Sequence, residues 1–169
     1  YLSQQVLNQQ PVKFRSFLLQ TSLLDEFNEE LCAVVFNDPL FPKLDWKKTI
    51  KEIQRNILFC MPVGPDGNWM RYHHLFRDFL QQQMREKYPD RVEKILDKAA
   101  RFYTQRGEWE KAYFLCEQRG DINALVTLVE ETSSLLVQND RLLTLGKWVD
   151  GIPEDMSRDR PIILSLKGF

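Results

Sequence analysis

The chain has 169 residues, of which 43% are hydrophobic and 28% charged, and its formal net charge is −1 at pH 7. This composition is ordinary for a globular protein with a core of its own, and it argues against a chain drawn as a whole to nucleic acid or to an anionic membrane. We expect a cytoplasmic protein with no signal peptide, since no apolar run is long enough to span a membrane.

Residues 1–56 predict a short leading helix followed by three longer ones. Residues 1–10 are amphipathic, and a second helix is predicted over Pro11–Leu24, because proline suits the first turn of a helix. Asn28 and Asp45 are good N-cap residues, so we expect one helix after Asn28 and another over Trp46–Arg55. The other signals of this region are the loop residues Pro39 and Pro42 and the apolar helix positions Leu31, Val34 and Val35.

A β-hairpin is predicted next. The apolar run Ile57–Met61 is too short for a surface helix, and turn residues 62–68 separate it from a second run, Trp69–Tyr72. Asp66-Gly67 between two such runs is a strong hairpin signal. Three helices followed by a hairpin is the order of a winged-helix domain, which we expect over residues 11–88.

From His73 onward the pattern is helical only. Helix starts are predicted near Pro89, Asp121 and Pro161, and Gly107 and Gly120 stand where helices usually end. The starts recur roughly every thirty to forty residues, which favours tetratricopeptide-like antiparallel repeats; an irregular helical bundle is the alternative. The expected inward positions are Leu75, Phe76, Phe79, Leu80 and Met84, then Val92, Ile95, Leu96, Ala99, Phe102 and Tyr103, then Ile122, Leu125, Val126, Leu128 and Val129. A further helix is expected from about Arg141 to Val149.

The three cysteines, Cys32, Cys60 and Cys116, lie far apart among apolar residues, and no CxxC pair occurs. An odd number of widely spaced thiols does not suit a disulfide framework or a zinc site. We therefore expect three buried thiols and no metal.

The segment Trp69–Leu80 is the most informative in the chain, because both histidines lie where the predicted strand meets a helix. The N-terminus of a helix has free backbone N–H groups that favour anions such as phosphate. The simpler alternative is that His73 and His74 are a surface pair that caps the helix. Because they are adjacent, we expect their side chains to point in different directions and not to share a metal ion.

Catalytic motifs are missing from the sequence. It contains no GxxxxGK[ST] phosphate loop, no GxSxG, no HExxH and no DxDxDG calcium loop. We therefore expect no catalytic site in this chain.

One predicted helix is basic on one side. Lys47, Lys51 and Arg55 recur at i, i+4 and i+8, and the third helix of a winged helix is the usual DNA reader. Glu52 dilutes this charge, and the hairpin tip is acidic at Asp66. The three cations are therefore candidates for contact with DNA or with protein.

The whole sequence resembles the region that follows the ATPase core in the large ATP-binding LuxR-type transcription activators, the signalling-ATPase family of the maltose-regulon activator. Phe17–Asp25 resembles the family's FLLRTSLLD, Arg71–Phe76 its RYHHLF, and Ala99–Gly107 its AAxWYxxxG. Shorter matches are Tyr1–Leu7 to YL..EVL, Leu31-Cys32 to LC, Asn56–Phe59 to ANLF, and Trp148–Pro153 to WLxxLP.

The resemblance implies a longer protein with a nucleotide-binding core, a winged helix, a helical sensor arm and a separate helix-turn-helix DNA reader. This chain would then hold residues 1–10 as a linker helix from the core, 11–88 as the winged helix, and 89–169 as the start of the arm. The implied partners are its own core and arm, a small-molecule or protein inducer on the arm, and DNA through a domain outside this chain. ATP or ADP would bind the core, and no cofactor would belong to this segment.

Residues 72–78 are also similar to the MHDLxRD segment of the wider signalling-ATPase class. In that class the histidine of the motif holds the β-phosphate of bound ADP and keeps the protein off. By position His73 matches that histidine, whereas His74 stands in place of the aspartate, so the role of His74 stays open. Phe114–Glu117 departs from the family's HALxAGD, although Arg119–Asp121 restores its ending.

These observations predict a non-catalytic regulatory segment that couples the nucleotide state of the core to the sensor arm of an inducer-controlled bacterial transcription regulator. One alternative is a winged helix that binds DNA directly and carries a helical dimerisation tail. Another is a scaffold fragment of a repeat protein.

Overall fold

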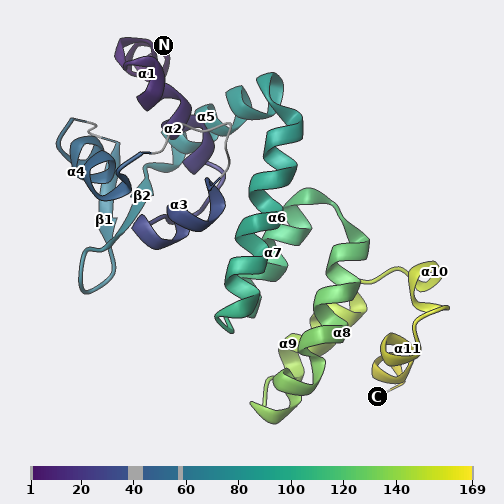
Figure 1. Cartoon of the computed structure of the whole chain (residues 1–169). Helices are drawn as coiled ribbons and strands as arrows, with labels where there is room; N and C mark the ends of the chain where they lie inside the picture. The colour runs from purple at the N-terminus through teal and green to yellow at the C-terminus, as the bar shows by residue number, and fades with distance from the viewer. Residues whose placement is uncertain (1, 38–43, 57–58, 169) are drawn as a thin grey trace. The chain divides into compact units, whose positions relative to one another are not determined.

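The computed structural model describes residues 2–37, 44–56 and 59–168. These residues form helices and one two-stranded sheet (Figure 1), in two compact units, Tyr1–Phe102 and Tyr103–Phe169. The first unit contains α1 (Leu2–Gln9), α2 (Val12–Thr21), α3 (Glu29–Val35), α4 (Trp46–Asn56), β1 (Cys60–Val63), β2 (Trp69–Tyr72), α5 (His74–Lys87) and most of α6 (Pro89–Gln105). The second contains α7 (Trp109–Arg119), α8 (Ile122–Gln138), α9 (Leu142–Asp150), α10 (Glu154–Ser157) and α11 (Pro161–Lys167).

This arrangement confirms the mainly α fold class, with three helices and a hairpin followed by helices that pack on one another. None of the helices in the described residues is long and apolar enough to cross a membrane. The loop predicted around Pro39 and Pro42 lies outside the described residues, as do Ile57 and Leu58 of the predicted first strand.

The predicted helix caps are confirmed. The Asn28 side chain accepts a hydrogen bond from the Leu31 N–H at 2.8 Å, and Asp45 and Asp121 make the equivalent bonds to Lys48 and Ala124, each at 3.0 Å. These carboxylate and amide oxygens satisfy N–H groups that have no partner within the helix. Gly107 and Gly120 have φ values of +73° and +65°, the left-handed conformation that ends α6 and α7.

The hairpin begins later than predicted. Among the described residues β1 is Cys60–Val63, so Pro62 and Val63 belong to the strand and not to the turn, and Phe59 precedes it. Cys60 is paired with Tyr72, and Val63 with Trp69. The turn is correspondingly tighter, closed by a 3.2 Å bond from the Gly67 N–H to the Gly64 carbonyl.

A third segment explains why a proline fits in β1. Phe27 forms an antiparallel bridge with Met70, donating to its carbonyl at 2.9 Å and accepting from its N–H at 2.8 Å. The polar groups of Met70 therefore face Phe27 and not β1. Because Pro62 lies opposite Met70, its missing N–H breaks no bond of the hairpin.

Three helices bury a narrower face than their apolar patterns predict. Leu75 and Ile122 were expected to point inward, and Val34 was one of the apolar positions of its predicted helix, yet all three are exposed. Successive helical residues are turned by about 100°, so a residue beside the central stripe reaches the core only where a neighbouring element covers it. In α3 and α5 the buried stripes are instead Leu31, Cys32 and Val35, and Phe76, Leu80 and Met84.

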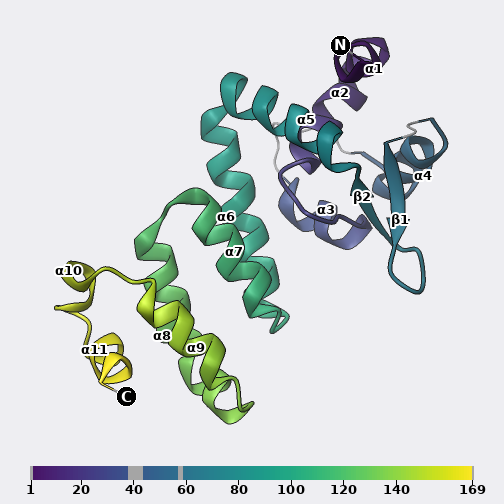
Figure 2. The same cartoon turned by 180° about the vertical axis from the view of Figure 1, so that it is seen from behind.

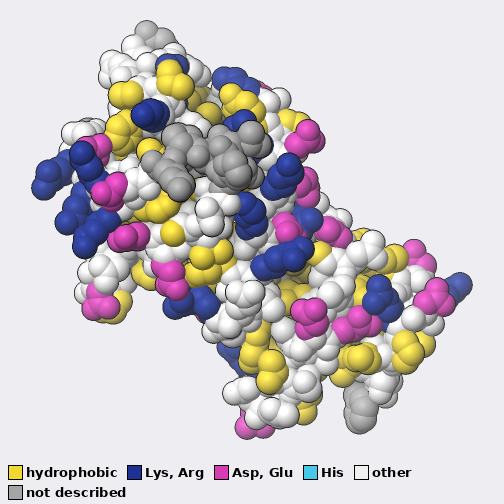
Figure 3. Space-filling view, in the orientation of Figure 1, with side chains coloured by type: hydrophobic (Ala, Val, Ile, Leu, Met, Phe, Trp, Pro, Cys, Tyr) yellow, Lys and Arg dark blue, Asp and Glu magenta, His cyan; other side chains and the backbone are white. Residues whose placement is uncertain are grey.

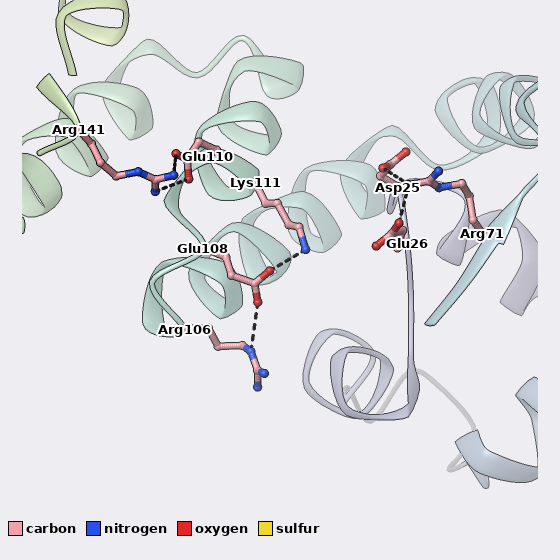
Figure 4. Close-up of polar contacts among 8 residues, drawn as sticks. All are labelled: Asp25, Glu26, Arg71, Arg106, Glu108, Glu110, Lys111 and Arg141. Atoms are coloured by element: carbon pink, nitrogen blue, oxygen red, sulfur yellow. Dashed lines mark hydrogen bonds and ion pairs between the residues drawn. The ribbon is translucent and has the colours of Figure 1, made fainter. Parts of the chain in front are cut away.

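The second unit has its own core. Helices α7, α8, α9 and α11 pack together around Val126, Val129 and Leu136 of α8 (Figure 2). The Tyr113 ring of α7 stacks on Trp148 of α9, with centroids 4.5 Å apart and planes 5° from parallel. An ion pair between Arg141 and Glu110, 2.7 Å apart, joins the start of α9 to α7 on the surface (Figure 4). All three cysteines are buried, as predicted.

Candidate functional site

The corner between β2 and α5 is one residue long. His73 connects the two elements with φ −56° and ψ 134°, an extended conformation that precedes the first helical residue, His74. Its N–H donates to the Phe59 carbonyl at 2.7 Å, and its carbonyl accepts from the Arg77 N–H at 2.9 Å. The main chain of His73 is therefore fixed by the hairpin on one side and by α5 on the other.

The two imidazole rings lie side by side, with centroids 4.4 Å apart and planes tilted by 31°. The expectation that they point in different directions was wrong, because His73 is extended and only His74 is helical, so the usual 100° turn does not separate them. His73 occupies the N-cap position but makes no side-chain capping hydrogen bond. Across the part of the chain that the structure describes, no group of three or more His, Cys, Asp or Glu residues is placed to hold a metal ion.

Tyr72, the residue before His73, anchors the corner on α2. Its hydroxyl lies 2.7 Å from Thr21 Oγ1, and Thr21 donates its own hydrogen to the Phe17 carbonyl at 2.8 Å. Tyr72 must therefore be the donor to Thr21. Burial, with a smaller effect of the nearby Cys60 thiol, raises the pKa of Tyr72 well above its usual value, so the donor hydrogen is retained at neutral pH.

Two arginines beside the histidines are held by carboxylates. Arg71 contacts Glu26 and lies 3.5 Å from Asp25 (Figure 4), and Arg77 pairs with the same Asp25. The Nε atom of Arg77 is buried and has no hydrogen-bond partner in the part of the chain that the structure describes, and Asp78 lies 3.8 Å from it. The charges of both guanidinium groups are therefore balanced at least in part by carboxylates of the segment that follows α2.

The basic side of α4 is exposed. Trp46 packs on Phe17 and Phe36, with ring centroids 5.9 and 5.8 Å apart, and Thr49 and Ile53 are buried. These contacts turn the opposite side of the helix outward. Figure 3 shows Lys and Arg side chains gathered over α4 with acidic side chains beside them, and the exposed cations there are Lys47, Lys48, Lys51 and Arg55.

The structure brings His73 and His74 together but does not join them to Lys47, Lys51 and Arg55. No hydrogen bond or ion pair connects the two sets within residues 2–37, 44–56 and 59–168. Sequence reasoning missed the residues that support the corner, Tyr72, Thr21, Asp25, Arg71 and Arg77. A polar threonine among the apolar residues of α2 was the one available signal for them.

Comparisons with known proteins agree with this architecture. The family described as the MalT winged helix domain matches residues 3–92. The chain is 26% identical over its whole length to the HTH-type transcriptional regulator MalT of Vibrio campbellii and 27% identical to that of Klebsiella pneumoniae strain 342. It is also 26% identical over 92% of its length to the serine/threonine-protein kinase PknK of Mycobacterium tuberculosis strain H37Rv. The chain spans 18% of each MalT protein and 14% of PknK.

Proposed function

The chain belongs to the MalT winged helix domain family, and we propose from this membership that it couples a nucleotide-binding core to a helical sensor arm in an inducer-controlled transcription regulator. Residues 11–88 would form the coupling winged helix, and residues 89–169 would begin the arm. The core, which would bind ATP or ADP, and a separate DNA-binding domain would lie outside this chain. The segment itself would carry out no catalysis.

The names of the relatives support a regulatory role. One is called an HTH-type transcriptional regulator and another a serine/threonine-protein kinase, yet both contain a segment similar to this one. A segment shared by a transcriptional regulator and a protein kinase is better suited to regulating the activity of the whole protein than to carrying out that activity. Fold alone would not decide this, because winged helices serve several functions.

The observation that carries the proposal is the placement of His73. It stands at the N-terminus of a 14-residue helix, where the helix dipole favours an anion, and its main chain is fixed on both sides. In this proposal the imidazole donates a hydrogen bond to a phosphate of ADP held by the core. Such a bond is charge-assisted when the imidazole is protonated.

A change at His73 would be passed on through α5. The carbonyl of His73 accepts the first bond of this helix, and Gln81 of α5 donates to the Ser22 carbonyl at 2.7 Å. The bond from Tyr72, at the end of β2, to Thr21 ties the other side of the corner to the same end of α2. Coupling between sites through such a packed element is typically worth about 1–3 kcal/mol, enough to bias a switch.

The proposal is tested by replacing His73 with alanine in the protein that carries the core. A charge-assisted hydrogen bond is worth roughly 1.5–3 kcal/mol, so we expect ADP affinity to fall about tenfold to a hundredfold and inducer-independent transcription to rise. Calorimetric titration with ADP and a reporter assay measure the two effects. His74→Ala is the matched control and should change ADP affinity much less.

Two results would contradict this role. Unchanged ADP affinity in the His73→Ala protein would leave this histidine as a structural residue of the corner. Tight ADP binding by the 169-residue chain alone would also contradict it, because this segment has the histidine but no phosphate loop.

Direct DNA binding is the second candidate function, and the exposed cations of α4 favour it. If α4 instead packs against protein, duplex DNA should bind this chain weakly, without sequence preference, and should be released as salt rises to physiological levels. Fluorescence anisotropy with labelled duplexes measures this. Tight, sequence-selective binding that Lys47→Glu plus Lys51→Glu abolishes would establish the DNA-reading function.

A matched control for that variant lies on α6. Lys94→Glu plus Lys98→Glu makes the same charge change at the same i, i+4 spacing in the same unit. Equal losses in both double variants would show that binding follows net charge and not the α4 surface.

A further inference from the structure

A cavity of about 350 Å³ lies in the first unit, between α1, α2, the end of α5 and the start of α6. Arg15 of α2, Lys87 of α5 and Arg91 of α6 all line it. No Asp or Glu side chain lines it within the part of the chain that the structure describes. Three cations from three helices therefore converge on one space without an acidic counterpart in its wall.

Arg15 is incompletely satisfied there. Its Nε atom is buried and has no hydrogen-bond partner among the described residues. A buried donor without a partner costs roughly 1–3 kcal/mol, so an acceptor placed in the cavity would recover that energy. Arg91 stands over the Tyr88 ring, 5.1 Å from its centroid, which holds the guanidinium at the wall of the cavity.

The rest of the wall is mixed. Leu7, Leu19 and Met84 are buried and supply an apolar part. Neutral polar side chains come from α1 and α2 in two linked pairs, with Gln4 donating to Asn8 at 2.9 Å and Gln20 donating to Ser16 at 2.7 Å. Each amide retains further donors and acceptors after these bonds, and such groups bind hydroxyls.

We propose that this cavity binds the phosphate monoester of a small hydroxylated metabolite. The phosphate would lie among Arg15, Lys87 and Arg91, whose charges suit a group that carries close to two negative charges at neutral pH. A monocarboxylate carries one negative charge only and would match these cations less well. The hydroxylated part would lie along the amides of α1 and α2, and the volume is at the lower end of the range of small-molecule sites.

This site is distinct from the corner at His73 and from the basic side of α4, since neither contributes to its wall. Its ligand would fasten α1 and α2 to the junction of α5 and α6. The inference does not depend on the proposed nucleotide role of His73.

Calorimetric titration of the chain with glucose 6-phosphate tests the proposal, with glucose and inorganic phosphate as comparison ligands. We expect glucose 6-phosphate to bind, inorganic phosphate to bind more weakly, and glucose not to bind at millimolar concentration. A thermal-shift assay should show stabilisation in the same order, because a ligand that binds only the folded state raises its stability. Absence of binding by both phosphate-bearing probes would overturn the proposal, as would equal binding of glucose and its phosphate.

Variants then locate the site. Arg15→Gln and Lys87→Gln should each weaken glucose 6-phosphate binding roughly tenfold, the value of one charge-assisted hydrogen bond. Arg85→Gln is the control, because Arg85 is an exposed cation of α5 close to Lys87 in sequence but outside the cavity wall. Lys87 lies at the exposed end of α5, so its variant keeps the test valid even if Arg15→Gln fails to fold. Equal weakening by Arg85→Gln would place the ligand on the surface and reject the cavity.

Discussion

Replacing Phe27 by alanine is expected to destabilise the first unit by roughly 3–5 kcal/mol, the range for truncating a fully buried phenylalanine. The Phe27 ring is 0% exposed. It lies 5.8 Å from the Phe17 ring and 5.1 Å from the Tyr72 ring, between α2 and the hairpin. Alanine at position 27 would keep the two backbone hydrogen bonds to Met70. The loss of stability would therefore come from the lost packing of the ring and from the cavity left behind.

The measurement is urea unfolding combined with hydrogen exchange of the hairpin amides, which follows the first unit by itself. Leu75→Ala is the control in the same unit, because Leu75 is 64% exposed, and we expect it to change stability by less than about 0.5 kcal/mol. A loss below about 1 kcal/mol in Phe27→Ala would show that the third segment beside the hairpin is not part of a packed core. This core matters for the proposed function because Tyr72, whose ring packs on Phe27, is the residue directly before His73.

Replacing Trp148 by alanine should have a similar effect on the second unit, again roughly 3–5 kcal/mol. Trp148 is 6% exposed and belongs to the core cluster formed with Val126, Val129 and Ile163. Its stacking on Tyr113 adds about 0.5–1.5 kcal/mol beyond the buried area. Loss of this side chain therefore removes both a large core volume and the contact between α7 and α9.

Hydrogen exchange of α8 and α9 amides and the near-ultraviolet circular dichroism of the aromatic pair measure this effect. Leu143→Ala on the same helix is the control, because Leu143 is 87% exposed. Alanine has a higher helix propensity than either residue, so propensity cannot explain a loss in these variants. Equal destabilisation by the two variants would show that the core contact of Trp148 does not set the stability of α9.

The features predicted correctly depend on short stretches of chain. Asn28, Asp45 and Asp121 each cap a helix through a bond to a residue three positions later, so cap and helix appear together in the sequence. The position of His73 at a strand-to-helix corner is predictable for the same reason, since strand, histidine and helix are consecutive. Gly107 ends its helix through its own φ value.

The errors arise where a distant segment intervenes. The first strand was predicted to end at Met61, whereas it continues to Val63. The sequence does not show that Phe27 pairs with Met70, and it is this pairing that allows a proline at position 62 of the strand. Leu75 was placed inward because an apolar pattern cannot show where the covering element ends. The rings of His73 and His74 meet because their conformations differ, which adjacency in sequence alone does not reveal.

The candidate sites also differ in whether they could be predicted from short stretches of sequence. By itself the sequence determined the helical elements, the winged-helix order, the basic side of α4 and the histidine corner, because each depends on interactions within a few residues. Only the tertiary structure decided that Thr21 accepts from Tyr72 across 51 positions and that Arg15 and Lys87 share a cavity. Such contacts depend on how buried side chains fill space and satisfy hydrogen bonds between elements, and periodicity along the chain carries no record of that pairing.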